Sequence, residues 1–171
     1  MKIKSFLTAL LHLCLLSAVS FSLISCKDES AEIGQPAPEI AAFDLQGNTV
    51  SLAQYKGKTT ILNFWSETCG MCITELKQFE QLMKQYPVHN LHILAINIDG
   101  EQAKTQDVVN KREITLPVVK DQLKITAERY KLIGTPSSFV IDPEGKILYK
   151  FESLIPDDFL HLLFQGQIKG Q

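Results

Sequence analysis

Two cysteines separated by two residues, Cys69 and Cys72, are the side chains of this sequence best placed to do chemistry. They follow an apolar, β-branched run over residues 59–65, and apolar residues at helical spacing begin directly after them. A buried strand, a CxxC pair and a helix in this order place the pair at the N-terminus of the helix. There the helix dipole and the free backbone N–H groups favour a thiolate over a thiol. The pattern therefore predicts a pair that exchanges electrons with other disulfides.

The CxxC pair has two other interpretations, a structural disulfide and half of a zinc site. His89 and His92 follow it as His-x-x-His. They lie farther from the cysteines than the roughly 12–15 residues of a zinc finger, and their own spacing is one residue tighter than usual. A non-enzymatic metal-binding or copper-delivery module usually has a wider cysteine spacing and a well-placed histidine. We therefore expect no metal and no cofactor, with both histidines at the surface or the edge of the core.

The composition predicts one globular domain with an appendage, and it argues against nucleic acid as a partner. The chain has 171 residues, of which 45% are hydrophobic and 21% charged. That is enough for a sizeable core and too apolar for disorder. The formal net charge is −2, and two of the basic residues, Lys2 and Lys4, stand at the N-terminus with no acid nearby. The remainder is therefore mildly acidic, which disfavours binding to a phosphate backbone.

The start of the chain has the pattern of an export signal, with Lys2 and Lys4 ahead of an apolar run over residues 6–24. The sequence Leu-Ile-Ser-Cys, which ends at Cys26, resembles the bacterial lipobox. The resemblance implies cleavage before Cys26 and a lipid on its thiol, with Cys14 discarded. An uncleaved transmembrane helix is the alternative, because the run approaches the roughly 20 residues that a bilayer requires. Both alternatives place the rest of the chain at the periplasmic face or beyond.

We expect a lipoprotein-type signal peptide over residues 1–25, a tether over 26–33 and a single domain over 34–168.

The body of the chain alternates strand and helix patterns. Short β-branched runs are bounded by turn residues, and segments with helical spacing lie between them. The first two strands form a hairpin, and the order of the rest predicts an α/β fold with a mixed central sheet flanked by helices. Strands are predicted at 40–43, 48–52, 59–65, 91–98, 116–119, 137–141 and 146–151, and helices at 73–86, 101–112, 122–130 and 156–164.

Three stretches of the sequence carry a family pattern. They read Phe64-Trp65-x-x-x-Cys69-x-x-Cys72-x-x-Glu75, Tyr130-x-x-x-Gly134-Thr135-Pro136-Ser137-Ser138-Phe139-Val140-Ile141-Asp142-x-x-Gly145, and Gly34-x-x-Ala37-Pro38 followed by Gly47-x-x-Val50-Ser51-Leu52. Over residues 33–164 the chain resembles the TlpA/ResA group of thioredoxin-like proteins, within the wider AhpC/TSA set. The resemblance implies a thioredoxin-like fold with an N-terminal β-hairpin extension. It also implies a membrane-tethered, extracytoplasmic thiol–disulfide oxidoreductase, often a reductant in cytochrome c maturation.

The two cysteines and one carboxylate are the predicted catalytic residues. Cys69, at the helix start, is the expected nucleophile, because a thiol pKa of about 8.5 can fall there to about 7 or lower. Cys72, one turn inward, resolves the mixed disulfide, so that a Cys69–Cys72 disulfide forms. In thioredoxins proper a buried aspartate stands where this chain has Asn63. The resemblance suggests that Glu75 supplies the carboxylate instead and relays a proton to or from Cys72. The alternative is an ordinary solvated glutamate on the helix face.

Three further residues are predicted to contact the substrate. Thr135 and Pro136 resemble the cis-proline loop of thioredoxins, which faces the CxxC pair and leaves the backbone before the proline free to pair with an extended segment. An ordinary trans proline before a strand is the alternative. Trp65 is a candidate wall of the thiol pocket, although a lone aromatic residue at a strand end is as often part of the core.

The predicted function is reduction of disulfides in exported proteins, with apocytochrome c as one candidate substrate. In an oxidising compartment a reductant must be recharged, so the resemblance implies a membrane electron donor of the DsbD/CcdA kind. The chain departs from the group at Thr68, Met71 and Lys77, and these departures leave the direction of electron flow open. A peroxiredoxin-like peroxidase is the main alternative. It needs a proline and a threonine ahead of a single reactive cysteine, where this chain has Leu62 and Ser66.

Overall fold

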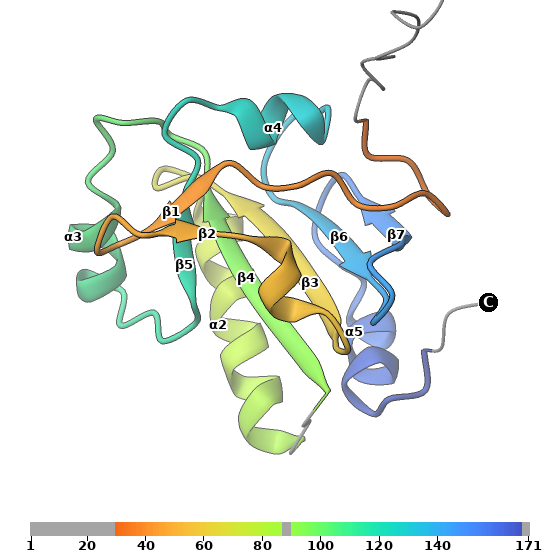
Figure 1. The fold of residues 1–171 in the computed structure, drawn as a ribbon. Coiled ribbons are helices and arrows are strands. Elements are labelled where there is room, and N and C mark those ends of the chain that lie inside the picture. The colour runs from red at the N-terminus through yellow and green to blue at the C-terminus, as the bar shows by residue number, and fades with distance from the viewer. Residues whose placement is uncertain (1–29, 87–89, 169–171) are drawn as a thin grey trace, which may run out of the picture.

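A seven-stranded mixed sheet forms the centre of the protein, with helices on both of its faces (Figure 1). The structure, a computed structural model, describes residues 30–86 and 90–168. The strand order across the sheet is β2-β1-β5-β4-β3-β6-β7. The strands are β1 (Ala42–Asp44), β2 (Thr49–Val50), β3 (Thr59–Trp65), β4 (Leu91–Asn97), β5 (Val118–Lys120), β6 (Ser137–Ile141) and β7 (Ile147–Phe151). The helices are the 3₁₀ helix η2 (Leu52–Tyr55) and the α-helices α2 (Gly70–Gln85), α3 (Thr105–Lys111), α4 (Ile125–Arg129) and α5 (Asp157–Phe164).

Strand β3 lies inside the sheet, and its β-branched and aromatic side chains are buried on both faces. It pairs in parallel with β4 and antiparallel with β6, and Ile61 lies opposite Ile93 on one side and Val140 on the other. Alternate residues of β3 therefore enter two separate cores. Ile61 and Trp65 pack on one face, while Leu62 and Phe64 pack on the other.

Helices α2, α3 and α5 cover the first face of the sheet, where Leu76 and Phe79 of α2 meet Leu160 of α5. Figure 1 shows α2 and α5 on the same side of the sheet, and these two helices contact one another. The second face is covered by the segment that leads into the β1–β2 hairpin and by Tyr130 at the end of α4, whose hydroxyl donates to the carbonyl oxygen of Pro38 at 2.7 Å. Cys69 and Cys72, at the start of α2, are thus held by a helix whose inner face packs against the core.

The predicted fold class, the N-terminal hairpin and the order of elements are confirmed, whereas several ends differ. The helix predicted from residue 101 begins only at Thr105, because Gly100 has a φ of +90° and the ammonium group of Lys120 donates to the carbonyl oxygens of Glu101 and Ala103. These contacts hold the turn out of helical geometry. The second hairpin strand ends at Val50 because the hydroxyl of Ser51 accepts the N–H of Ala53 and starts η2.

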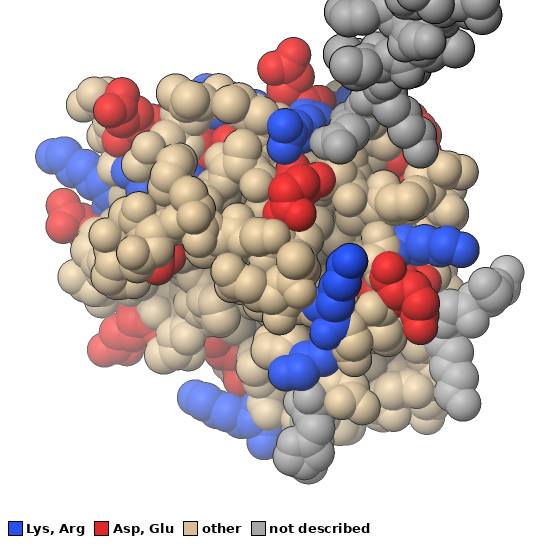
Figure 2. All heavy atoms as spheres, viewed as in Figure 1, with Lys and Arg blue, Asp and Glu red and all other residues tan. Residues whose placement is uncertain are grey.

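The predicted signal peptide and the lipidation site Cys26 lie outside the described residues. In the part of the predicted tether that the structure describes, Ala31 is buried, and its N–H donates to the carbonyl oxygen of Arg129 at 3.1 Å. Packing against the domain therefore includes residues ahead of the predicted start at 34. Across 30–86 and 90–168, no helix is both long enough and apolar enough to span a bilayer. On the face in Figure 2, acidic and basic side chains are interspersed without a large patch of one sign.

Candidate active site

Cys69 and Cys72 form a disulfide across the first turn of α2. Strand β3 ends at Trp65, a turn follows in which the N–H of Cys69 donates to the carbonyl oxygen of Ser66 at 3.1 Å, and Cys69 then takes an extended conformation as the N-cap of the helix. Its Sγ atom accepts the N–H of Cys72 at 3.2 Å. A sulfur in the N-cap position thus receives a free backbone N–H of the first turn, which is the arrangement that stabilises a thiolate.

The two sulfurs of the pair differ in their access to solvent. Cys72 is fully buried, whereas Cys69 is only partly buried. Between them, Met71 projects outward with 56% of its surface exposed. A large disulfide substrate can therefore approach the sulfur of Cys69 but not that of Cys72.

The loop that precedes β6 faces the disulfide. The Thr135–Pro136 peptide bond is cis, as predicted, and the carbonyl oxygen of Thr135 lies 3.7 Å from Sγ of Cys69. The hydroxyl of Ser137 donates to the carbonyl oxygen of Gly134 at 2.8 Å and closes the loop. The backbone of Thr135 therefore borders the sulfur that a substrate can reach, although its contact with substrate stays a prediction.

Glu75 lies in the interior, one turn after Cys72, and not on a solvated helix face. Its Oε2 atom accepts Nδ2 of Asn63 at 2.7 Å, and its Oε1 atom accepts the backbone N–H of Ile155 at 2.8 Å. Burial raises the pKa of Glu75, and these two hydrogen bonds only partly oppose that rise. A carboxyl group whose pKa is raised by burial keeps its proton to a higher pH than an exposed glutamate does.

Residues 33–150 match the profile of the AhpC/TSA family. The chain belongs to the AhpC/TSA family. Within it the chain resembles thiol-disulfide oxidoreductase ResA of Bacillus thuringiensis, with 32% identity over 146 residues that cover 84% of this chain and 83% of ResA. ResA of Bacillus subtilis is 26% identical over 166 residues, covering 94% of this chain and 92% of its own. The chain is therefore a ResA-like thiol–disulfide oxidoreductase.

Solved structures agree with the fold of this ResA-like chain. The thioredoxin domain of a thiol-disulfide oxidoreductase from Bacteroides vulgatus superposes with a TM-score of 0.69 at 26% identity, over 82% of this chain and 100% of that one. A thiol:disulfide interchange protein from a Bacteroides species gives 0.68 at 28% identity, over 79% and 90% of the two chains. The predicted thioredoxin-like fold and the resemblance to the TlpA/ResA group are thus confirmed.

Of the three residues predicted to contact substrate, Trp65 lies deepest in this ResA-like structure. It is fully buried and packs in the same apolar cluster as both cysteines. Its indole N–H has no hydrogen-bond partner among the described residues. The side chain lies behind the disulfide as part of the core, so direct contact between Trp65 and a substrate stays a prediction that this burial disfavours.

Of the two histidines considered in the zinc interpretation, the structure describes only His92. His89 lies outside the described residues. His92 is on β4, partly buried, with its ring edge-on to Tyr55 at a centroid distance of 5.4 Å. Burial, together with the charge of Lys58, lowers the pKa of His92. Among residues 30–86 and 90–168, no group of three or more His, Cys, Asp and Glu side chains is arranged to hold a metal ion.

Sequence patterns did not indicate three of the site's neighbours. Ser138 accepts the second N–H of the Asn63 amide at 2.8 Å, and Ile155 reaches Glu75 through its backbone from a loop 80 residues away. A backbone contact of this kind leaves no signal in the sequence. Asp99 contacts the turn before Cys69, and its one signal was an acidic residue two positions after a buried strand that pairs with β3.

Proposed function

We propose that this protein reduces disulfides of exported proteins outside the cytoplasm, where a lipid on Cys26 anchors it to a membrane. The observation that carries the catalytic part is the contrast between Cys69, open to an approaching disulfide beside the Thr135 carbonyl, and Cys72, enclosed behind it. The anchoring part is supported by the basic and apolar N-terminal pattern of the sequence. The names of the relatives support the reaction class.

The reaction proceeds by two exchange steps. The thiolate of reduced Cys69 attacks one sulfur of the substrate disulfide, so that a mixed disulfide forms and one substrate thiolate leaves. Cys72 then loses its proton to the carboxylate of Glu75 and attacks Sγ of Cys69. The second substrate thiolate leaves, and the Cys69–Cys72 disulfide remains. The substrate gains two electrons and takes up protons, while the protein is oxidised by the same two electrons.

The oxidised pair must be reduced again before a second cycle. The reductant proposed for this step is a membrane dithiol protein of the DsbD/CcdA kind, which passes two electrons outward by the same exchange chemistry. The substrates proposed are cysteine pairs of exported proteins, of which apocytochrome c is the one that the resemblance to the TlpA/ResA group implies.

If the protein acts as a reductant, its reduction potential should lie well below that of the strong oxidant DsbA, about −120 mV. A measured potential at or above that value contradicts the direction proposed.

Trapping tests the catalytic proposal. In the Cys72→Ala variant the mixed disulfide on Cys69 has no resolving thiol, so complexes with substrate proteins should accumulate in cells and dissociate on treatment with dithiothreitol. The double variant Cys69→Ala/Cys72→Ala is the control and should trap none. Equal trapping by both variants, or none by Cys72→Ala, contradicts the assignment of Cys69. A comparison of insulin reduction with peroxide consumption by the parent protein separates a reductase from a peroxidase.

Lipid labelling tests the anchor. Cells that produce the full chain in the presence of a labelled fatty acid should incorporate the label into the parent protein and not into the Cys26→Ala variant. Cys14→Ala is the matched control, because Cys14 lies in the segment that is proposed to be removed. Loss of label in Cys14→Ala, or its retention in Cys26→Ala, contradicts the proposed modification.

A further inference from the structure

The turn that precedes Cys69 is hydrogen-bonded to Asp99, just beyond the end of the neighbouring strand β4. Ser66 donates its hydroxyl to Oδ1 of Asp99 at 2.6 Å, and the backbone N–H of Glu67 donates to Oδ2 of the same carboxylate at 2.7 Å. The carbonyl oxygen of Ser66 in turn accepts the N–H of Cys69. Two hydrogen bonds in series therefore connect the carboxylate of Asp99 with the backbone of the attacking cysteine.

Asp99, which follows the C-terminal end of β4, is itself held by two hydrogen bonds. Nδ2 of Asn97 donates to Oδ2 of Asp99 at 2.8 Å, and the N–H of Asp99 donates to Oδ1 of Asn97 at 3.1 Å. Asn97 is fully buried and lies opposite Trp65 in the parallel register of β3 and β4. Through the carboxylate of Asp99, the turn between β3 and α2 is therefore hydrogen-bonded to the paired ends of β3 and β4.

The electrostatic setting keeps Asp99 in its accepting form. Burial opposes ionisation, but the hydrogen bonds from Ser66, Glu67 and Asn97, together with the charge of Lys124, outweigh it and lower the pKa of Asp99. Charge-assisted hydrogen bonds of this kind are stronger than neutral ones. The turn is therefore held by an ionised carboxylate throughout the neutral pH range.

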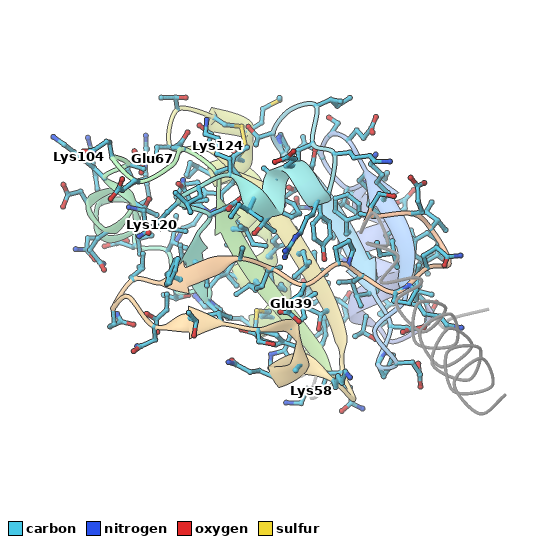
Figure 3. All side chains as sticks on the ribbon, turned by 45° about the horizontal axis from the view of Figure 1, so that its top comes forward. Glu39, Lys58, Glu67, Lys104, Lys120 and Lys124 are labelled. Atoms are coloured by element: carbon cyan, nitrogen blue, oxygen red, sulfur yellow. A yellow bond between two sulfur atoms is a disulfide. The ribbon has the colours of Figure 1, made fainter. Side chains whose placement is uncertain are left out.

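A second contact fixes the same turn from helix α3. Oγ1 of Thr105, the first residue of α3 and almost fully buried, donates to Oε1 of Glu67 at 2.9 Å. In the view of Figure 3, Glu67 lies toward one end of the strands and Lys58 toward the other. The turn thus has three such hydrogen bonds, two to Asp99 in the connection between β4 and α3 and one to Thr105 at the start of α3.

We propose that Asp99 is a positioning residue for thiol–disulfide exchange, which holds the turn at residues 66–68 so that Sγ of Cys69 stays aligned with the N-terminus of α2 and the Thr135 carbonyl. This inference rests on the proposed role of Cys69 as the attacking thiol. Stabilisation of the thiolate requires the 3.2 Å contact between Sγ and the N–H of Cys72. A displacement of about 1 Å at a reacting group can lower a rate up to about 100-fold.

Two substitutions at Asp99 separate position from charge. Asp99→Asn keeps the shape of the side chain and an acceptor for the N–H of Glu67, while its amide can donate to the hydroxyl of Ser66. Asp99→Ala removes both contacts. If Asp99 acts by position, the Cys69 pKa should rise toward about 8.5 in Asp99→Ala and stay at or below the parent value in Asp99→Asn. If it acts only by its negative charge, the pKa should fall in both variants, which overturns the proposal.

The measurement is the pH dependence of alkylation of Cys69 by iodoacetamide in the fully reduced protein, with the labelled cysteine identified by mass spectrometry. Asp99→Ala should also reduce insulin about tenfold more slowly than the parent at pH 7, and Asp99→Asn within about threefold of it. Asp44→Ala is the matched control. Its carboxylate braces the β1–β2 turn through the N–H groups of Gln46 and Asn48, and its loss should leave the Cys69 pKa unchanged.

Other outcomes are equally decisive. A parent-like pKa and rate in folded Asp99→Ala overturns the positioning role. If that variant does not fold, Ser66→Ala removes one of the two contacts and should raise the Cys69 pKa by a smaller amount; no rise overturns the proposal. A parent protein that reduces no insulin contradicts the proposed function, whereas the alkylation profiles still decide whether Asp99 positions Cys69.

Discussion

Asn63 and Glu75 meet inside the protein, where Nδ2 of the asparagine donates to Oε2 of the glutamate at 2.7 Å and both side chains are buried. The contact joins the central strand β3 to helix α2 one turn after Cys72. An uncharged strand residue and a helix carboxylate thus form a hydrogen-bonded pair in the interior. Because the asparagine does not titrate, Glu75 is the titratable member of this pair, and burial raises its pKa.

The first prediction concerns stability and pH in the Glu75→Gln variant. Burial raises the pKa of Glu75 above its ordinary value of 4.5. Between that value and the raised one, the folded protein holds more protons than the unfolded chain, so this group lowers the free energy of unfolding as pH increases. Each unit of pKa shift corresponds to about 1.4 kcal/mol. Glutamine removes the effect and can still accept the N–H of Ile155. Its amide can donate to Oδ1 of Asn63 once the Asn63 amide turns over, because Nδ2 faces this position in the parent.

Urea unfolding of parent and variant at pH 4 and pH 8 measures this linkage. The variant should gain stability relative to the parent as pH rises through this window. Parallel pH profiles of the two proteins would show that Glu75 has no raised pKa in the folded state.

The second prediction concerns the kinetics of the same variant. If Glu75 takes the proton of Cys72, Glu75→Gln should slow the release of the mixed disulfide about 10- to 100-fold near neutral pH. The first attack by Cys69 should change little, because its thiolate is stabilised by the helix N-terminus. Single-turnover mixing with a disulfide peptide, quenched with acid and followed by mass spectrometry, resolves the two steps. Equal slowing of both steps would contradict a proton relay to Cys72.

The third prediction exchanges the roles of the strand and helix residues. Asn63→Asp places a second carboxylate against Glu75, and two carboxylates at hydrogen-bond distance cannot both be ionised without a large cost. The variant should lose about 2 kcal/mol or more of stability at pH 7. The double variant Asn63→Asp/Glu75→Gln restores one carboxylate and one amide and should recover most of that loss. Thermal unfolding of the parent, of Asn63→Asp, of Glu75→Gln and of the double variant gives the coupling energy, and additive losses would mean that the two residues do not interact as the structure indicates.

Sequence patterns predicted most of the architecture because the strongest periodicities belong to the elements that build the core. Strand β3 has the predicted bounds, and helix α2 begins within three residues of its predicted start, since burial on fixed faces leaves these segments little choice. The ends of α3 and α4 were missed because they depend on tertiary contacts. Lys124 takes a left-handed conformation ahead of α4, and the carboxylate of Asp121 accepts the N–H of Ala127.

The candidate site divides in the same way. The disulfide of Cys69 and Cys72 and the cis peptide bond before Pro136 carry local signatures and were predicted. The role of Asp99 depends on which strand ends lie side by side, so the residue types alone could not reveal it. For Trp65 the sequence could not decide between two positions, since an aromatic residue near a reactive pair gives the same pattern in the core and on the surface.

The attack by Cys69 is tested most directly by a competition between the two thiols. The fully reduced parent protein is exposed to limiting iodoacetamide at pH 6 and pH 7, quenched with acid and digested, and the label on each cysteine is quantified by mass spectrometry. The partly exposed sulfur at the helix N-terminus should carry nearly all of the label, leaving Cys72 unmodified until Cys69 is saturated. Equal labelling of the two cysteines, or faster labelling of Cys72, would contradict Cys69 as the thiol that captures the substrate.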